Sequence, residues 1–484
     1  MEEIDIASVT RRSIKGVFAL TSRTFVIQII TFLSNFLLTI FLSPQVFGIY
    51  FLVSAVIAFL SYFSDIGLAA ALIQKREKIT DDELKTTFTI QQGLVIVLVS
   101  IALILSPFIS SLYRLRPDAV ILFQALCVAF FLSSLKTIPS IILERSLKFE
   151  KLVLPQIVES LVFSLTSVIL AIKGFDLTSF TIAVLARGLS GVIVIYIVQP
   201  WKPRLGFSKK AASELLSFGI PFQTNSLLAL IKDDLLTVYL GKILPLAQVG
   251  YIGFAQKWAF TPLRLIMDNI IRITFPSFSR LQGQGKVLSN ALEKSIFAAS
   301  FLIFPSLAGL VILFPYFLTI IPKYSKWEPA LLSLGFFAVN AGFSSISTPL
   351  TNVLNATGRI KLTLGLMVFW TISTWTLTVL GVSMFGFNAV AVVSALISMS
   401  AVFVVILVRR YIDFNIIRPT LPPFIATVFM SLVMYPLSSF IIKDTLTLFL
   451  MIVIGGMVYF LVIFAIAKKQ IILDIKMIKE NLKR

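Results

Sequence analysis

The stretch "FAQKWAFTPLRLIMDNIIRITFP", residues 254–276, has the length of a membrane-spanning helix but carries four charged side chains. About 20 residues of helix cross the hydrocarbon core of a bilayer. A charge at the centre of the bilayer costs about 2.5–3.5 kcal/mol on insertion scales. The charges of Lys257, Arg264, Asp268 and Arg272 therefore indicate a membrane helix with one face turned away from lipid.

The composition of the whole chain supports a polytopic membrane protein. Its 484 residues are 57% hydrophobic and 13% charged, and the mean hydropathy is +0.96. Soluble domains have about 25% charged residues. The segment at 17–42 lacks a cleavage site and is expected to be the first span. Fourteen apolar segments are predicted, centred near residues 29, 60, 99, 130, 163, 188, 229, 262, 308, 342, 373, 399, 431 and 457.

Basic residues set the predicted orientation. With a cytoplasmic N-terminus, the inner segments hold 28 of the 42 Lys and Arg, and the outer connections hold seven. Because short cytoplasmic loops are rich in Lys and Arg, both termini are predicted to be cytoplasmic. This bias explains most of the net charge of +19 without a nucleic-acid partner.

The chain lacks the residues that several kinds of catalytic or nucleotide-binding site require. The chain has no histidine and a single cysteine, Cys127, so imidazole catalysis and an internal disulfide are excluded. The segment "GQGKVL" (283–288) has Arg280 and Val287 where a P-loop needs Gly and Ser or Thr, so no ATP site is expected. The tail "KKQIILDIKMIKENLKR" has an apolar stripe edged with lysines, which favours a helix on an anionic leaflet.

A weak internal repeat divides the spans. "LTIFLSPQVFGIY" (38–50) resembles "LTVYLGKILPLAQVGY" (236–251), and "RPDAVILFQAL" (116–126) resembles "WEPALLSLGFF" (327–337). Because an even number of crossings separates the copies, the two halves are expected to be parallel repeats. The predicted parts are a six-helix lobe at 1–205, a second at 206–410, two helices at 411–467 and a basic cytoplasmic tail at 468–484.

Twelve charged residues fall inside predicted spans and form the candidate site. The four on 254–276 lie within about 80° of arc, and Thr24, Gln28, Thr31 and Asn35 form a polar stripe on the first span. The basic members are Arg23, Lys136 and Arg272 towards the inner third, Arg187, Arg264 and Lys232 near the middle, and Lys257 towards the outer third. The acidic members are Asp65, Glu159, Asp233, Asp234 and Asp268.

Two interpretations of these charges remain open. A series of cations at different depths suits an anion that crosses the membrane, because guanidinium and ammonium groups bind phosphate oxygens. Alternatively, the charges neutralise one another, for example as an Arg264–Asp268–Arg272 ladder. The acids likewise either bind Na⁺ or H⁺ for coupling or balance neighbouring cations.

Five stretches resemble the multidrug/oligosaccharidyl-lipid/polysaccharide exporter superfamily, and within it the Wzx-type polysaccharide repeat-unit flippases. They are "FSDIGLAAALIQK" (63–75), "LERSLKFEKL" (143–152), "LLSFGIPFQTNSLL" (215–228), "ITFPSFSRLQ" (273–282) and "KWEPALLSL" (326–334). The resemblance implies an all-α protein of about 14 spans, with two six-helix lobes in a V shape and two further helices. It also implies transport of a polyprenyl-pyrophosphate-linked oligosaccharide between leaflets through a cationic cavity.

The sequence therefore predicts a lipid-linked saccharide flippase in a bacterial or archaeal plasma membrane. Expected partners are the lipid-linked saccharide, membrane lipids, and a polysaccharide polymerase and glycosyltransferases. No cofactor is expected, although Na⁺ or H⁺ coupling is allowed. The alternatives are a multidrug antiporter of the same superfamily and a membrane-embedded polymerase or glycosyltransferase. An excess of embedded cations disfavours the antiporter, and the lack of a large loop disfavours the enzyme.

Overall fold

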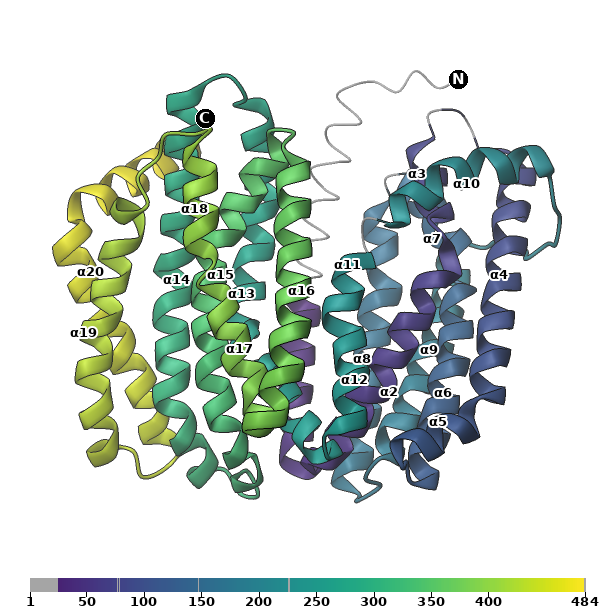
Figure 1. The fold of residues 1–484 in the computed structure, drawn as a ribbon, viewed down its shortest axis with the longest axis horizontal. Coiled ribbons are helices and arrows are strands. Elements are labelled where there is room, and N and C mark those ends of the chain that lie inside the picture. The colour runs from purple at the N-terminus through teal and green to yellow at the C-terminus, as the bar shows by residue number, and fades with distance from the viewer. Residues whose placement is uncertain (1–24, 76, 78, 147, 225–226, 483–484) are drawn as a thin grey trace. The chain divides into compact units, whose positions relative to one another are not determined.

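The chain folds into helices that are long and apolar enough to cross a membrane. The computed structural model describes residues 25–75, 77, 79–146, 148–224 and 227–482. In this part of the chain all regular secondary structure is helical (Figure 1). Within these described ranges, ten helical stretches qualify as membrane spans by length and hydropathy. The prediction of an all-α polytopic membrane protein is confirmed, whereas fourteen spans and a V-shaped pair of lobes stay predictions.

The first compact unit comprises Met1–Gly250. In this unit α8 and α9 form the most extensive contact, and α6 packs against α9, α4 and α2. The described elements are a helix at Phe25–Phe41, α2 (Pro44–Asp65), α3 (Leu68–Gln74), α4 (Asp81–Ile104), α5 (Ser106–Tyr113), α6 (Pro117–Ser134), α7 (Thr137–Arg145), α8 (Phe149–Ile172), α9 (Thr178–Val198), α10 (Lys209–Thr224), α11 (Leu227–Leu230), the π-helical turn η1 (Ile231–Leu235) and α12 (Leu236–Ile243).

The second compact unit comprises Tyr251–Arg484. In this unit α19 and α20 pack against each other and against α14 (Figure 1). Its elements are α13, which begins in the first unit (Leu246–Arg280), α14 (Gly285–Ile320), the 3-10 turn η2 (Ser325–Ala330), α15 (Leu331–Ala356), α16 (Ile360–Phe385), η3 (Gly386–Asn388), α17 (Ala389–Ser398), α18 (Ala401–Arg409), α19 (Ile417–Ile441) and α20 (Thr445–Leu482).

The division into compact units falls after residue 250, whereas the sequence predicts lobes that divide after residue 205. The segment between these positions joins the first unit because α10 packs against α3 and α4, and α12 packs against α2. Compactness does not decide which helices form a pseudo-symmetric lobe, so the lobes at 1–205 and 206–410 and the pair at 411–467 stay predictions. Within α20, Ala467 has non-helical backbone angles, at the boundary predicted between the last span and the tail.

Local sequence signals explain the break between α2 and α4, where one of the five quoted stretches lies. Ile66 (φ 46°) and Gly67 (φ 73°) take left-handed backbone angles and end α2, a conformation that glycine adopts without strain. Thr80 then begins α4 with a capping box, because its side chain accepts from Glu83 N while the Glu83 side chain accepts from Thr80 N.

Two segments that resemble each other in sequence meet through glycine. A Cβ placed on Gly48 would overlap the carbonyl oxygen of Leu246, and one placed on Gly250 would overlap that of Pro44. The contact is therefore reciprocal. Gly48 and Gly250 are separated along the chain by the same number of residues as Pro44 and Leu246. Small residues allow helix backbones in membranes to approach this closely. The first turns of α2 and α13 are thus held together by backbone contact.

Candidate functional site

A buried ion-pair network lies among the spans of the first unit. Lys136 Nζ lies 2.6 Å from Glu159 Oε1, and Arg187 Nε lies 3.6 Å from Glu159 Oε2. The Glu159 side chain is only 10% exposed. Gly191, one turn after Arg187 on α9, makes room for it, since a Cβ there would overlap Glu159 Oε1. The sequence predicts these three residues as site residues, and the structure brings them together.

The network carries one more positive than negative charge. Glu159 has a counter-ion for each oxygen, which is the geometry of a charge-balancing carboxylate. Arg187, by contrast, has a side chain that is 52% exposed, and its guanidinium carbon lies 6.0 Å from the centre of the Phe163 ring. The exposed edge of Arg187 can therefore meet a further anion while Glu159 keeps its orientation.

Asp65 lies at the end of α2 and has a structural partner. Its Oδ1 accepts a hydrogen bond of 3.2 Å from Ala69 N in the first turn of α3. A carboxylate at a helix N-terminus is stabilised by the unpaired N–H groups and the helix dipole. The side chain thus helps to place α3, and its predicted role in ion coupling stays a prediction.

Lys232, Asp233 and Asp234 lie in the π-helical turn η1. Lys232 Nζ lies 3.2 Å from Asp233 Oδ1, and the Asp233 side chain is 68% exposed. Single π-helical turns inside longer helices are found frequently at functional sites. The structure supports the pairing of Lys232 with an acid, and it leaves the predicted binding or coupling roles of this turn as predictions.

The charged face predicted on α13 is present in the second unit. Lys257, Arg264, Asp268 and Arg272 are all exposed on this helix. Other positions on α13 pack into the unit, where Ala255, Ala259, Met267 and Phe278 are buried. Among the described residues, Arg264 and Asp268 do not form an ion pair with each other. The first link of the alternative Arg264–Asp268–Arg272 ladder is therefore not formed. This face can accept an anion or water.

The polar stripe of the first span lies only partly within the described residues. Arg23 and Thr24 lie outside them, so the predicted phosphate contact of Arg23 stays a prediction. Further along the helix, Asn35 Nδ2 donates to the Thr31 carbonyl oxygen over 2.5 Å. Thr31 itself is exposed. The visible part of the stripe is therefore polar and accessible on at least one turn.

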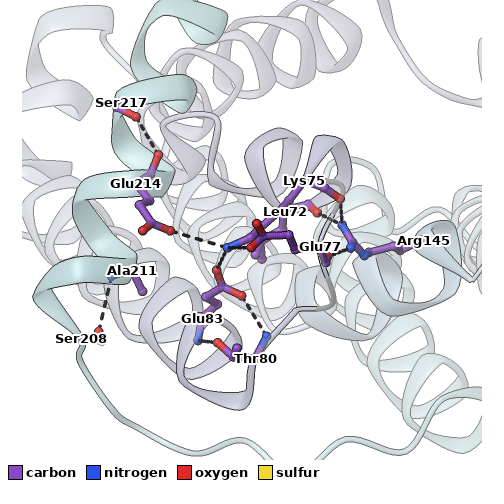
Figure 2. Close-up of polar contacts among 10 residues, drawn as sticks. All are labelled: Leu72, Lys75, Glu77, Thr80, Glu83, Arg145, Ser208, Ala211, Glu214 and Ser217. Atoms are coloured by element: carbon purple, nitrogen blue, oxygen red, sulfur yellow. Dashed lines mark hydrogen bonds and ion pairs between the residues drawn. The ribbon is translucent and has the colours of Figure 1, made fainter. Parts of the chain in front are cut away.

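A second ionic network, which sequence reasoning missed, lies where α3 ends and α4 begins (Figure 2). Lys75 forms an ion pair with Glu83 and lies 3.6 Å from a carboxylate oxygen of Glu214 on α10. Hydrogen bonding to Glu83 raises the pKa of Lys75, with further raising by the charges of Glu214 and Glu77. From the sequence, Lys75 is only one of the cations expected on the cytoplasmic side, although the capping box that begins at Thr80 could have indicated that Glu83 turns back towards this loop.

Arg145, the last residue of α7, contacts the same region. Its guanidinium donates to the carbonyl oxygens of Leu72, Lys75 and Glu77, as Figure 2 shows. These carbonyls lie at the end of α3 and in the residues after it, where no helical N–H is available for them. Arg145 therefore supplies the C-terminal cap of α3.

Replacing Arg145 by methionine is expected to lower the free energy of unfolding by about 1.5–3 kcal/mol, the range for hydrogen bonds to a charged group. Thermal unfolding of the purified protein measures the effect. Lys148→Met removes a nearby exposed cation and is the matched control. Equal melting temperatures for the two variants would contradict the capping role.

The fold and the charged spans together define a polytopic membrane protein. The structure is similar to the inward closed conformation of the lipid II flippase MurJ, with a TM-score of 0.76, 15% identity, and coverage of 93% of this chain and 99% of that chain. It is also similar to an inward-facing MATE family multidrug resistance transporter of the MOP superfamily, with a TM-score of 0.60, 15% identity, and coverage of 81% and 98%. Residues 37–332 match the family model described as polysaccharide biosynthesis protein. The chain belongs to this family, and the resemblance predicted from the sequence is confirmed.

Curated relatives are similar over most of the chain. An uncharacterized membrane protein in the cps region of Klebsiella pneumoniae is 27% identical over 474 residues, which is 95% of each chain. The succinoglycan biosynthesis transport protein ExoT of Rhizobium meliloti is 23% identical over 81% of this chain and 77% of the relative. The lipopolysaccharide biosynthesis protein WzxC of Escherichia coli K12 is 24% identical over 67% of this chain and 66% of the relative.

Proposed function

We propose that the protein is a flippase that moves a polyprenyl-(pyro)phosphate-linked oligosaccharide from the inner to the outer leaflet of the plasma membrane. The product would supply cell-surface polysaccharide synthesis. One combination of observations carries the proposal: the chain belongs to a polysaccharide biosynthesis family, and 93% of it has the fold of a lipid II flippase. The names of ExoT and WzxC, which refer to succinoglycan transport and lipopolysaccharide biosynthesis, support it.

In the proposed mechanism, the head group crosses through a cationic cavity that opens alternately to each side, while the polyprenyl tail remains in lipid. Guanidinium groups suit the phosphates because their N–H donors match phosphate oxygens in pairs. The exposure of Arg264 and Arg272 on α13 and of Arg187 on α9 supports this part of the proposal. We assign phosphate contacts first to Arg23, Arg264 and Arg272, and then to Lys257, Arg187, Lys232 and Lys136.

Direction would come from the membrane potential or from an ion gradient, without a cofactor or an ATP site in this chain. One elementary charge that crosses 100 mV gains about 2.3 kcal/mol. The acids that would take part in Na⁺ or H⁺ coupling are Asp65, Asp233, Asp234 and Asp268. The partially exposed Lys232–Asp233 pair supports η1 as one place where an ion could exchange. Both termini would lie in the cytoplasm, and glycosyltransferases and a polymerase would act on the same lipid-linked saccharide.

The multidrug antiporter remains the second candidate, because MATE transporters share the fold. An antiporter of this kind is expected to take organic cations, whereas the Glu159 network carries an excess positive charge and includes an exposed guanidinium. The family match and the charge of the site both favour the saccharide carrier. A membrane-embedded polymerase or glycosyltransferase is the least favoured alternative, because the fold is shared with transporters.

Replacing Arg264 by alanine is expected to abolish export of the surface polysaccharide. The substrate phosphate would lose the guanidinium that is proposed to bind it within the membrane. The measurement is surface polysaccharide in cells whose only copy is the variant, with the membrane level of the protein determined in parallel. Arg280→Ala, at the end of the same helix, is the control and should export normally. Full export by the Arg264 variant would refute its assigned contact, and cation-drug resistance conferred by the wild type would favour the antiporter.

A further inference from the structure

The segment between α9 and α10, residues 199–208, is bound along the side of α4. Gly206 N donates to Thr89 Oγ1 over 3.0 Å, and Ser208 N donates to Thr86 Oγ1 over 2.9 Å. The Trp201 ring meets the Phe88 ring edge to face, with centroids 5.1 Å apart. The segment 199–208 is therefore held against the first turns of α4.

These contacts place the segment at the depth of the membrane interface. Thr86 and Thr89 are five and eight residues after Asp81, where α4 begins. At 1.5 Å per residue, they lie about 7.5 and 12 Å below the end of that helix. Because α4 qualifies as a membrane span by length and hydropathy, we infer that residues 206–208 lie beside its outermost turns, where head groups would meet hydrocarbon.

Side chains of two kinds point away from α4 at this level. Leu205 is 77% exposed and Phe207 is 67% exposed, so both present apolar surface outside the protein. Lys202, Arg204, Lys209 and Lys210 are also exposed, on both sides of this apolar pair. The nearby acid Asp81 offers limited compensation, since it already pairs with Lys85 over 2.5 Å and also interacts with the charge of Arg204.

We propose that residues 202–210 form a docking surface for anionic glycerophospholipids in the leaflet where α9 ends. Leu205 and Phe207 enter the acyl region, and the four cations contact lipid phosphates. Apolar side chains set in a basic surface at the level of the head groups are the pattern of interfacial anchors. Each Lys or Arg near an anionic leaflet contributes about 1 kcal/mol of attraction. The complementary charge of the lipid, the depth and the two outward apolar side chains together select this occupant over a soluble protein.

The test measures the depth of single sites in the full-length protein in nanodiscs. Cys127 is fully buried, so a cysteine introduced by Phe207→Cys or Leu205→Cys can be labelled selectively with a nitroxide. Power-saturation EPR compares collisions with oxygen, which concentrates in lipid, and with a water-soluble nickel chelate. Lys210→Cys, on the polar end of the same surface, reports the level of the head groups.

With phosphatidylglycerol mixed into phosphatidylcholine, labels at 205 and 207 are expected to favour oxygen several-fold, and the label at 210 is expected to favour nickel. In pure phosphatidylcholine, or after Lys202→Gln with Arg204→Gln, the preference at 207 should fall several-fold. A nickel preference at both 205 and 207 in every lipid would overturn the proposal and leave the surface open to a protein partner. An oxygen preference that is independent of lipid charge would overturn the role of the cations.

Discussion

Replacing Gly48 by alanine is expected to destabilise the protein strongly, because the new Cβ would overlap the Leu246 carbonyl oxygen. That oxygen belongs to helix backbone and cannot rotate away, so the first turns of α2 and α13 must move apart. Overpacking of this kind costs about 1–3 kcal/mol in proteins. The expected result is a lower melting temperature in detergent or nanodiscs, with reduced accumulation in the membrane.

Gly93→Ala is the matched control, because no atom lies within 4 Å of a Cβ placed there on α4. Alanine also favours a helix interior by about 1 kcal/mol over glycine, so this variant should be neutral or more stable. Gly250→Ala should resemble Gly48→Ala, since it meets the Pro44 carbonyl oxygen in the same way. The double variant should cost less than the two single effects together, because both substitutions force apart the same contact. Equal stability of Gly48→Ala and Gly93→Ala would refute the close approach.

Replacing Glu159 by alanine is expected to have the second large effect. It leaves Lys136, whose side chain is only 16% exposed, without its carboxylate partner. Removing one member of a buried ion pair costs about 3–5 kcal/mol, because the remaining charge is uncompensated. Thermal unfolding measures this loss, and the added Lys136→Met substitution should restore much of it by removing that charge.

Asp118→Ala provides the control for an exposed ion pair. Asp118 lies 2.9 Å from Arg116, and its side chain is 38% exposed. Pairs exposed to water contribute about 0–1 kcal/mol, so this substitution should hardly change the melting temperature. If Glu159→Ala and Asp118→Ala lose the same stability, then the network around Glu159 is hydrated and not a buried structural element.

Measurements of polysaccharide export distinguish a structural role of the Glu159 network from a role in binding substrate. If Arg187 contacts substrate phosphate, Glu159→Ala/Lys136→Met should still transport poorly after its stability is restored, because Arg187 has lost the carboxylate that orients it. Arg187→Gln should lose export while keeping most of the stability, since that side chain is half-exposed. Normal export by Arg187→Gln would limit the network to folding.

The sequence predicted well those features that arise from periodicity along one helix. The four charges of α13 share an exposed face because their spacing follows the helical repeat, and no neighbouring element is needed to predict it. Contacts between distant segments were harder to predict. Glu159 was expected to balance or couple charge, but its two partners on α9 and before α7 follow from packing that a single sequence does not reveal.

The network around Lys75 and the contacts of α10 with α3 and α4 were not predicted, for the same reason. Lys75 appeared as one of several loop cations, and only the folded chain brings it next to Glu214. The lobe boundary predicted at 205 rested on a repeat, whereas compactness depends on which helices touch. α10 touches α3 and α4, partly because Gly67 and Gly219 allow their backbones to approach.

The reciprocal contact of Gly48 with Gly250 has a consequence for the ancestry and recombination of this chain. Each glycine lies against the backbone of the other segment, so neither copy of the similar sequence can gain a side chain there without a change in its counterpart. The two positions should therefore vary together during evolution, if they vary at all. Chimeras that exchange one half with a relative should remain viable only when both donors supply glycine at this pair.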